Sequence, residues 1–220
     1  MTVDEASEKL KSMNREGIKN GWSESDTQGE ETYGLNHTAI QKASKDFEKD
    51  PFLADELYAS NNHDLKVLAA HIDDPESYTK DELEKRSDQL YLSPFGEKFC
   101  QKVMAKSPYA VHFVDMWVKS DNASMRCFGY LTLQELAKLK NNLADDFFSD
   151  HLEGIASRIP NASEDAKKCM ISALSSIAKR SEGLQQASLK LLHDIDLASS
   201  ATRRIERILL KTSTTKKAKN

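Results

Sequence analysis

The sequence predicts an all-α fold in which short antiparallel helix pairs stack as a superhelical solenoid. Glycine and proline are scarce, with 8 and 5 among 220 residues. No segment shows the alternation and β-branched enrichment that are typical of strands. Apolar residues instead recur at helical spacing, and polar capping residues separate the periodic stretches. Hydrophobic residues make up 39% of the chain and charged residues 30%, as in a protein with much exposed helix surface.

Capping residues mark most of the predicted helix starts. Thr2 and Thr79 each stand three positions before a glutamate, which is the pattern of a capping box. Asp50 precedes Pro51 as a cap precedes the first residue of a helix. Residues 21–35 are polar and glycine-bearing, so we expect a loop there. The predicted helices cover residues 3–20, 36–47, 51–59, 62–72, 144–157, 163–180, 182–194 and 199–211, and further helices begin at residues 79 and 93.

Residues 107–139 are predicted to form two helices joined by the polar turn 119–122. Ser107 and Pro108 suit the cap and first position of the first helix. The second helix is apolar nearly all round from Met125 to Leu133, which indicates burial on several sides. Arg126 is the only charge in that run. Because a buried cation needs a partner or an anion, Arg126 is a candidate functional residue.

The same hairpin repeats an earlier stretch of the chain. Residues 54–69 and 114–129 share Asp, Ser and Asn at matching positions, and Lys66 corresponds to Arg126. A weaker match further along the chain places Lys168 at the position of Arg126. Stacked two-helix units of this kind are typical of HEAT-like repeats. The offset between the two stretches exceeds one such unit, so we allow for an intervening unit around residues 79–106.

The repeat gives Lys66, Arg126 and Lys168 equivalent places on second helices. They are therefore predicted to line one concave surface, where a row of cations suits a phosphate backbone. The alternative is that each is a single snorkelling or ion-paired residue. Residues 161–220 are also basic, with 12 Lys and Arg against 6 Asp and Glu, although the whole chain carries a net charge of −4. A solvated helical face is the alternative explanation of that excess.

Other patterns exclude several classes of site and set the expected organisation. Three cysteines and six histidines show no metal-binding spacing, so no metal and no cofactor are expected. No apolar run approaches the roughly 20 residues of a membrane span, and a signal-peptide core is absent, so we expect a cytoplasmic protein without membrane contact. We expect one domain over residues 1–211 and a basic flexible tail over 212–220.

Several stretches, taken in order, resemble the DNA alkylation repair family of the AlkD type, whose members are HEAT-like glycosylases that excise alkylated bases. The resemblance runs from about residue 32 to residue 211 and implies the same ARM-like fold. The stretches that carry it are Thr32-Tyr-Gly-Leu35, Asp50-Pro-Phe-Leu-Ala-Asp-Glu-Leu-Tyr58, Leu65-Lys-Val-Leu-Ala-Ala-His-Ile-Asp-Asp-Pro75, Lys106-Ser-Pro-Tyr-Ala110, the pair of helices around Trp117 and Arg126, and Ala173-Leu-Ser-Ser-Ile-Ala-Lys-Arg180.

The resemblance also implies a site, from which this sequence departs in part. Family members carry a tryptophan four positions before an aspartate, and the matching positions here are Ser93 and Glu97. Glu97 is therefore the candidate catalytic carboxylate, expected to stabilise the positive sugar as a base leaves. A shift of one turn would make Tyr91 or Phe95 the aromatic residue instead. A second family tryptophan and the arginine after it fall at Ser172 and Ser175.

Two functional hypotheses follow from these patterns. In the first, a concave groove binds double-stranded DNA, and any activity is that of a 3-methyladenine-type DNA glycosylase. The expected DNA contacts are Lys66, Arg126, Lys168, Lys179 and Arg180. In the second, the solenoid is a non-catalytic scaffold whose groove binds a protein or nucleic acid partner. The acidic N-terminal portion and the missing tryptophans favour the second hypothesis.

Overall fold

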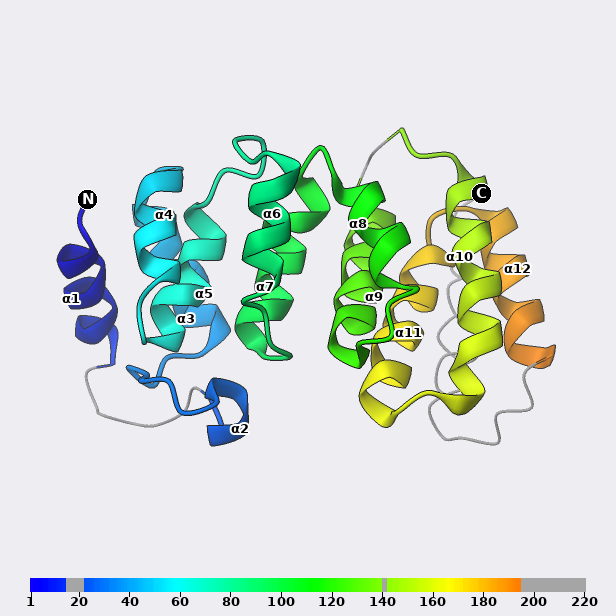
Figure 1. Cartoon of the computed structure of the whole chain (residues 1–220), viewed down its shortest axis with the longest axis horizontal. Coiled ribbons are helices and arrows are strands. Elements are labelled where there is room, and N and C mark those ends of the chain that lie inside the picture. The colour runs from blue at the N-terminus through cyan, green and yellow to red at the C-terminus, as the bar shows by residue number, and fades with distance from the viewer. Residues whose placement is uncertain (15–21, 140–141, 195–220) are drawn as a thin grey trace, which may run out of the picture. The chain divides into compact units, whose positions relative to one another are not determined.

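A computed structural model describes residues 1–14, 22–139 and 142–194 of the chain. These residues form helices and turns, and no strand occurs among them (Figure 1). The chain divides into two compact units, residues 1–111 and residues 112–220. The α-helices are α1 (Val3–Met13), α2 (Glu24–Thr27), α3 (His37–Ala43), α4 (Pro51–Tyr58), α5 (His63–Ile72), α6 (Lys80–Ser87), α7 (Pro94–Lys102), α8 (Ala110–Trp117), α9 (Ala123–Lys138), α10 (Asp145–Arg158), α11 (Glu164–Ile177) and α12 (Glu182–Asp194).

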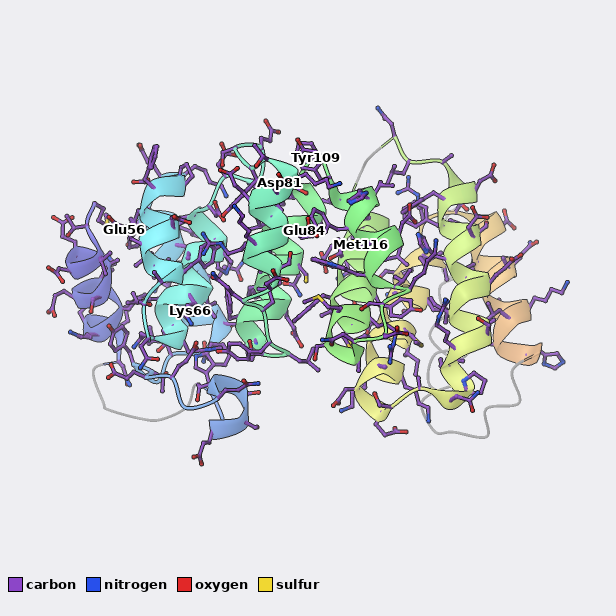
Figure 2. The ribbon with its side chains drawn as sticks, in the orientation of Figure 1. Glu56, Lys66, Asp81, Glu84, Tyr109 and Met116 are labelled. Carbon is purple, nitrogen blue, oxygen red and sulfur yellow. The ribbon has the colours of Figure 1, made fainter. Side chains whose placement is uncertain are left out.

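Unit 1 is built around α5, which packs against α3, α4 and α7. Nearly every residue of α5 is buried, including Leu65 and Leu68. Phe99 of α7 and Leu57 of α4 are also fully buried in this unit. Burial of this apolar surface is the main driving force for packing the helices together. The outer surfaces of α4 and α6 carry the exposed acidic residues Glu56, Asp81 and Glu84 (Figure 2), together with the exposed Phe52 of α4.

Unit 2 is organised in the same way around α9 and α11, which pack along each other, while α10 packs against α11 and α12. Gly129 lies where the end of α8 approaches α9. A Cβ atom at Gly129 would lie 2.8 Å from the backbone nitrogen of Val118 and 3.0 Å from Cβ of Trp117. The two helices can therefore approach this closely because residue 129 lacks a side chain.

The predicted caps are confirmed at three helix starts. Thr2 and Thr79 form complete capping boxes at the starts of α1 and α6. Asp50 caps α4, with Pro51 as the first helical residue. The prediction that Ser107 caps the next helix is wrong, because the Ser107 hydroxyl donates to the Met104 carbonyl and α8 begins only at Ala110.

The repeat also corresponds to equivalent structure. Asn62 caps α5 and Asn122 caps α9, so Lys66 and Arg126 do occupy the same place one turn into each second helix. The starts of α4, α6 and α8 at residues 51, 80 and 110 show that the offset spans two helix pairs. The intervening unit expected around residues 79–106 is the pair α6–α7.

Some predictions differ from the structure or lie outside it. The expected loop at residues 21–35 contains the short helix α2, capped by Ser23. The last part of the helix predicted at 3–20, the helix predicted at 199–211 and the basic tail at 212–220 lie outside the described residues. The extent of a single domain over 1–211 stays a prediction. In the described part of the chain, no helix has the length and apolarity needed to cross a membrane.

Candidate nucleic-acid interface

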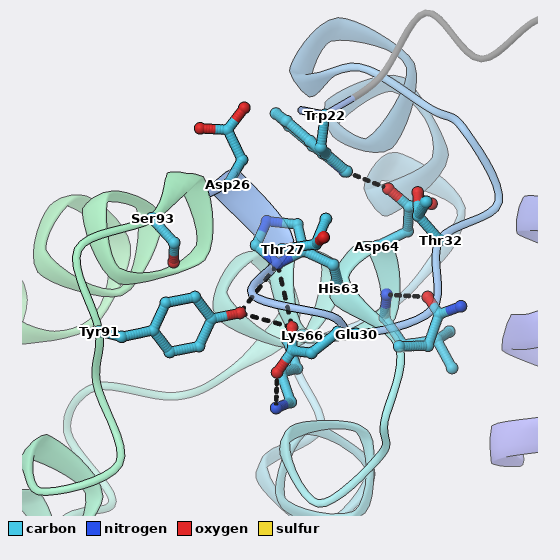
Figure 3. Close-up of polar contacts among 12 residues, drawn as sticks. Trp22, Asp26, Thr27, Glu30, Thr32, His63, Asp64, Lys66, Tyr91 and Ser93 are labelled. Carbon is cyan, nitrogen blue, oxygen red and sulfur yellow. Dashed lines mark hydrogen bonds and ion pairs between the residues drawn. The ribbon is translucent and has the colours of Figure 1, made fainter. Parts of the chain in front are cut away.

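Asp64 anchors residues 22–34 to the start of α5. Its side chain is fully buried. The carboxylate accepts a hydrogen bond from Trp22 Nε1 at 2.6 Å (Figure 3). It also accepts from Thr32 Oγ1 at 2.9 Å and from the Tyr33 amide at 2.6 Å. Hydrogen bonds to a charged acceptor are stronger than those to a neutral one. The polar segment is therefore fixed by contacts to a residue that lies far along the chain.

A second carboxylate, the largely buried Glu30, joins the same segment to α5 and to the residues before α7. Glu30 accepts from the Tyr91 hydroxyl at 2.5 Å, contacts His63 Nδ1 at 3.1 Å and forms an ion pair with Lys66 (Figure 3). Burial alone would raise the pKa of Glu30, but these hydrogen bonds together hold it below its usual value. The ammonium of Lys66 is thus occupied within unit 1.

Three planar rings lie together beside these anchors. The ring centroid of Trp22 is 4.8 Å from that of His37 and 5.2 Å from that of His63, in edge-to-face arrangements. Burial, together with the nearby Lys98, lowers the pKa of His37 to about 4, so His37 is neutral at pH 7. Burial also lowers the pKa of His63, against the opposing effect of Glu30. His37 Nδ1 and His63 Nε2 are both buried without a hydrogen-bond partner in the described residues.

Ser93 and Glu97, the pair that the family resemblance singled out, lie at the start of α7. The Ser93 hydroxyl accepts from the Gly96 amide and caps the helix, and Ser93 is only 4% exposed. The side chain of Glu97 is exposed in the first turn. The surrounding protein partly desolvates the Glu97 carboxyl and raises its pKa, Lys98 opposes this effect, and Asp26 reinforces it. The charge of Asp26, in the segment that contains Trp22, therefore acts on the Glu97 carboxyl.

Four further positions were expected at or near the site from the family resemblance. None of them supplies an exposed aromatic ring at the start of α7. Tyr91 is held by Glu30 through its hydroxyl group. Phe95 is 3% exposed and packs between Tyr58 and Phe99 in the core of unit 1. Neither ring therefore stands free at the start of α7. Ser172 and Ser175 lie on α11 of unit 2, where neither supplies an aromatic ring.

Four lysines of unit 1 lie on α7, just after it, and beside the end of α5, where Lys49 donates to the His71 carbonyl, and sequence reasoning did not single them out. We call Lys49, Lys98, Lys102 and Lys106 the lysine face. Burial lowers the pKa of His71 to about 4, and the nearby Lys102 and Lys98 contribute to this shift. Burial likewise lowers the pKa of Lys49, to which Lys106 and Lys102 contribute while Asp73 opposes.

The members of the lysine face differ in their hydrogen bonds and in their exposure to solvent. Lys49 Nζ donates to the His71 carbonyl at 3.2 Å and to the Asp73 carbonyl. Lys98 Nζ donates to Gln101 Oε1 at 2.7 Å. Lys102 is half-buried and Lys106 is exposed. The signal in the sequence was the spacing of Lys98 and Lys102, since an i, i+4 pair lies on one side of a helix.

The cations predicted in unit 2 have different surroundings from one another. Arg126 Nη1 donates to the carbonyls of Ser120 at 2.7 Å and Asp121 at 2.9 Å, which ties it to the turn before α9. Lys168 on α11 pairs with Asp165 at 2.9 Å, and its side chain is 75% exposed. Lys179 is exposed just after α11. These three residues are not buried, so contact with DNA stays a prediction for each of them.

Arg180 is a structural residue of unit 2 by its contacts. Its guanidinium donates to the carbonyls of Leu139 at 3.3 Å and Leu143 at 2.6 Å. It also lies over the ring of Phe148, 4.5 Å from the centroid. Both kinds of contact stabilise the packing of α10 against the chain that precedes it.

Groups of three or more side chains suited to a metal ion do not occur in the described ranges. Cys100 and Cys127 are buried and Cys169 is half-buried, and no disulfide joins these three residues.

Comparison with known proteins gives one family and one informative structure. A family model described as DNA alkylation repair enzyme matches residues 6–204. A solved structure matches with a TM-score of 0.82 and 21% identity, covering 96% of this chain and 95% of that chain. It is described as belonging to a new family of proteins related to the HEAT-like repeat DNA glycosylases with affinity for branched DNA structures. No curated protein sequence matches the chain. The predicted all-α, HEAT-like fold is confirmed.

Proposed function

Since the chain belongs to the DNA alkylation repair enzyme family, we propose that it is a DNA-binding protein that recognises branched DNA and does not excise bases. The lysine face of unit 1 is the observation that carries this proposal. The solved structure with the same fold belongs to a family with affinity for branched DNA, which supports the choice of this form of DNA. That affinity is a property of the relative, which shares 21% sequence identity with this chain. We extend it to this chain as part of the proposal.

The electrostatics of unit 1 favour a polyanion on one surface. Exposed acids such as Glu56, Asp81 and Glu84 lie on α4 and α6, where the exposed Lys80 and Lys85 stand among them. The lysine face instead combines Lys98 and Lys102 on α7, Lys106 just after α7, and Lys49 just before α4. A lysine that neutralises a DNA phosphate releases a condensed counterion, which supplies much of the free energy of binding at low salt.

Unit 2 is proposed to add weaker contacts through Arg126, Lys168 and Lys179. Lys168 and Lys179 reach solvent, and Arg126 is half-buried. Lys66 and Arg180, which we also expected to contact DNA, are engaged by Glu30 and by backbone carbonyls respectively. We therefore assign these two residues to the stability of their units, and their replacement should weaken DNA binding only through unfolding.

Replacing Lys98 and Lys102 together with glutamine is expected to weaken DNA binding about tenfold near 0.1 M salt, and to lower the salt slope of log K by about 2. The measurement is fluorescence anisotropy with a labelled four-way junction and with a linear duplex of equal length, at several salt concentrations. The matched control is the pair Lys80→Gln and Lys85→Gln on α6, which removes the same charge from the same unit. The wild type should bind the junction more tightly than the duplex.

Two results would contradict the proposal. Equal losses in both double variants would mean that net charge, rather than the lysine face, sets the affinity. Absence of salt-sensitive binding by the wild type would favour the alternative function, a scaffold for a protein partner.

Release of methylated purines from alkylated DNA is expected to stay at background, for the wild type and for Glu97→Gln alike. The physical reason is that Ser93 is a buried helix cap, so this position supplies no aromatic face for a cationic base. The measurement is the chromatographic release of 3-methyladenine and 7-methylguanine. Release by the wild type that falls in Glu97→Gln would instead establish an enzyme in which Glu97 stabilises the positive sugar.

A further inference from the structure

Trp22 is a half-buried indole that is held at the surface of unit 1 along one edge. Its Nε1 donates to Asp64, and its ring meets His37 and His63 edge to face. These contacts fix the plane of the indole (Figure 3), and Trp22 as a residue is half-buried. Proteins that bind single-stranded nucleic acid use fixed aromatic faces of this kind to stack bases.

The imidazoles beside the indole have unused hydrogen-bonding capacity. His63 is 0% exposed, yet its Nε2 has no partner in the described residues, and His37 Nδ1 lacks one as well. An unpaired buried polar atom is costly, so such atoms call for a ligand, a water molecule or a functional reason. The edge of a nucleobase offers both donors and acceptors, and His37 as a residue is half-buried, unlike the fully buried His63.

The charged side chains near the rings suit the two polar parts of a nucleotide, its phosphate and its base. Lys98 lies on α7, which packs against α5, the helix that begins with His63, and its charge adds to the effect of burial in lowering the pKa of His37. Glu97 is exposed in the first turn of α7, and its carboxyl is an acceptor for an exocyclic amino group. In this arrangement the phosphate would contact the lysine face, and the base would stack on Trp22.

We propose that Trp22 and His37 form a stacking site for a single unpaired nucleobase of the bound DNA, next to the lysine face that holds its phosphate. This inference rests on the proposed DNA-binding function and gives it a source of specificity. Bases in an intact duplex are stacked and paired, so they do not reach the indole. A branch point or a fork presents unpaired bases, so the site distinguishes branched from linear DNA.

The fluorescence of Trp22 reports directly on stacking in the unmodified full chain. The chain has two tryptophans, and Trp117 is only 3% exposed and packs against Phe113 and Phe128. A forked duplex with unpaired deoxyadenosines, whose bases carry an exocyclic amino group, is expected to quench the accessible part of the emission. A blunt duplex of the same length, at a concentration that saturates binding, is expected to leave the emission nearly unchanged.

Trp22→Leu is expected to abolish this quenching and to weaken binding of the forked duplex at least fivefold, the lower end for loss of one stacked base. Its binding of the blunt duplex is expected to stay within about twofold of the wild type. Phe52→Leu is the matched control, since Phe52 on α4 is 86% exposed and also belongs to unit 1. This control should quench and bind as the wild type does.

The outcomes separate the stacking site from the proposed function. Binding of both duplexes without quenching by the fork would overturn the stacking site and leave DNA binding intact. Equal quenching by forked and blunt DNA would also overturn it. Absence of binding to either DNA would overturn the proposed function itself. The quenching of the wild type does not depend on how well Trp22→Leu folds.

Discussion

Replacing Asp64 with alanine is expected to lower the free energy of unfolding of unit 1 by about 3–5 kcal/mol. The carboxylate is fully buried and accepts from Trp22, Thr32 and the Tyr33 amide. Its removal leaves three donors without their charged acceptor. A donor that stays buried after the substitution has no hydrogen-bond partner, whereas water satisfies the same donor in the unfolded chain.

Urea denaturation followed by circular dichroism measures this loss, and Trp22 emission should shift toward that of a solvated indole. Glu56→Ala is the matched control, since it removes an exposed carboxylate from α4 and should change stability by no more than about 0.5 kcal/mol. Asp64→Asn should fall between the two, since one amide oxygen can still accept. A loss below about 1 kcal/mol in Asp64→Ala would show that water replaces the carboxylate, and would contradict the anchoring role.

The helices could be predicted from sequence because their signals are local. Asn62 and Asn122 each precede a helix by one position, and their side chains accept from amides two or three positions later. The interactions that fix such a start are complete within one helical turn. The repeat of residues 54–69 at 114–129 could be read for the same reason, since equivalent caps and equivalent apolar faces recur in one order.

The structure of residues 21–35 was less predictable from the sequence, because it depends on partners that are distant along the chain. Glu30 pairs with Lys66 and Tyr91, and Trp22 bonds to Asp64. A polar, glycine-bearing stretch has no apolar period that would indicate these contacts. The same contacts explain why Lys66, which has the same repeat position as Arg126, has a carboxylate partner instead of an open surface.

The candidate site was accessible from sequence only in part. The resemblance identified the start of α7 as part of the site. The position where it implied an aromatic residue is Ser93, which is a buried helix cap. The aromatic side chain in the segment near Glu97 comes instead from Trp22, which precedes α2 and lies far from α7 along the chain. The lysines were visible, yet their proximity to Lys49 depends on the packing of α5 against α7.

Unit 1 is expected to lose stability as the pH falls from 6.5 to 4, because His37 and His71 stay neutral in the folded chain. Each has a pKa of about 4, against an ordinary value of 6.5. Between these values the unfolded chain takes up protons that the folded chain does not. Stability is therefore retained above pH 6.5 and lost progressively below it, by about 1–2 kcal/mol per histidine at pH 5, allowing for partial exposure.

The comparison that isolates this effect is the pH dependence of unfolding in His37→Gln/His71→Gln against that in the wild type. Asp73 and Glu97 have raised pKa values, so they favour the folded chain on acidification, but they are present in both proteins and cancel. His112→Gln, an exposed change on α8, should keep the wild-type profile. The double variant should lose about 2–4 kcal/mol less than the wild type between pH 7 and pH 5. Parallel profiles would mean that both imidazoles become protonated within the folded unit, which would also remove the neutral ring that the stacking site requires beside Trp22.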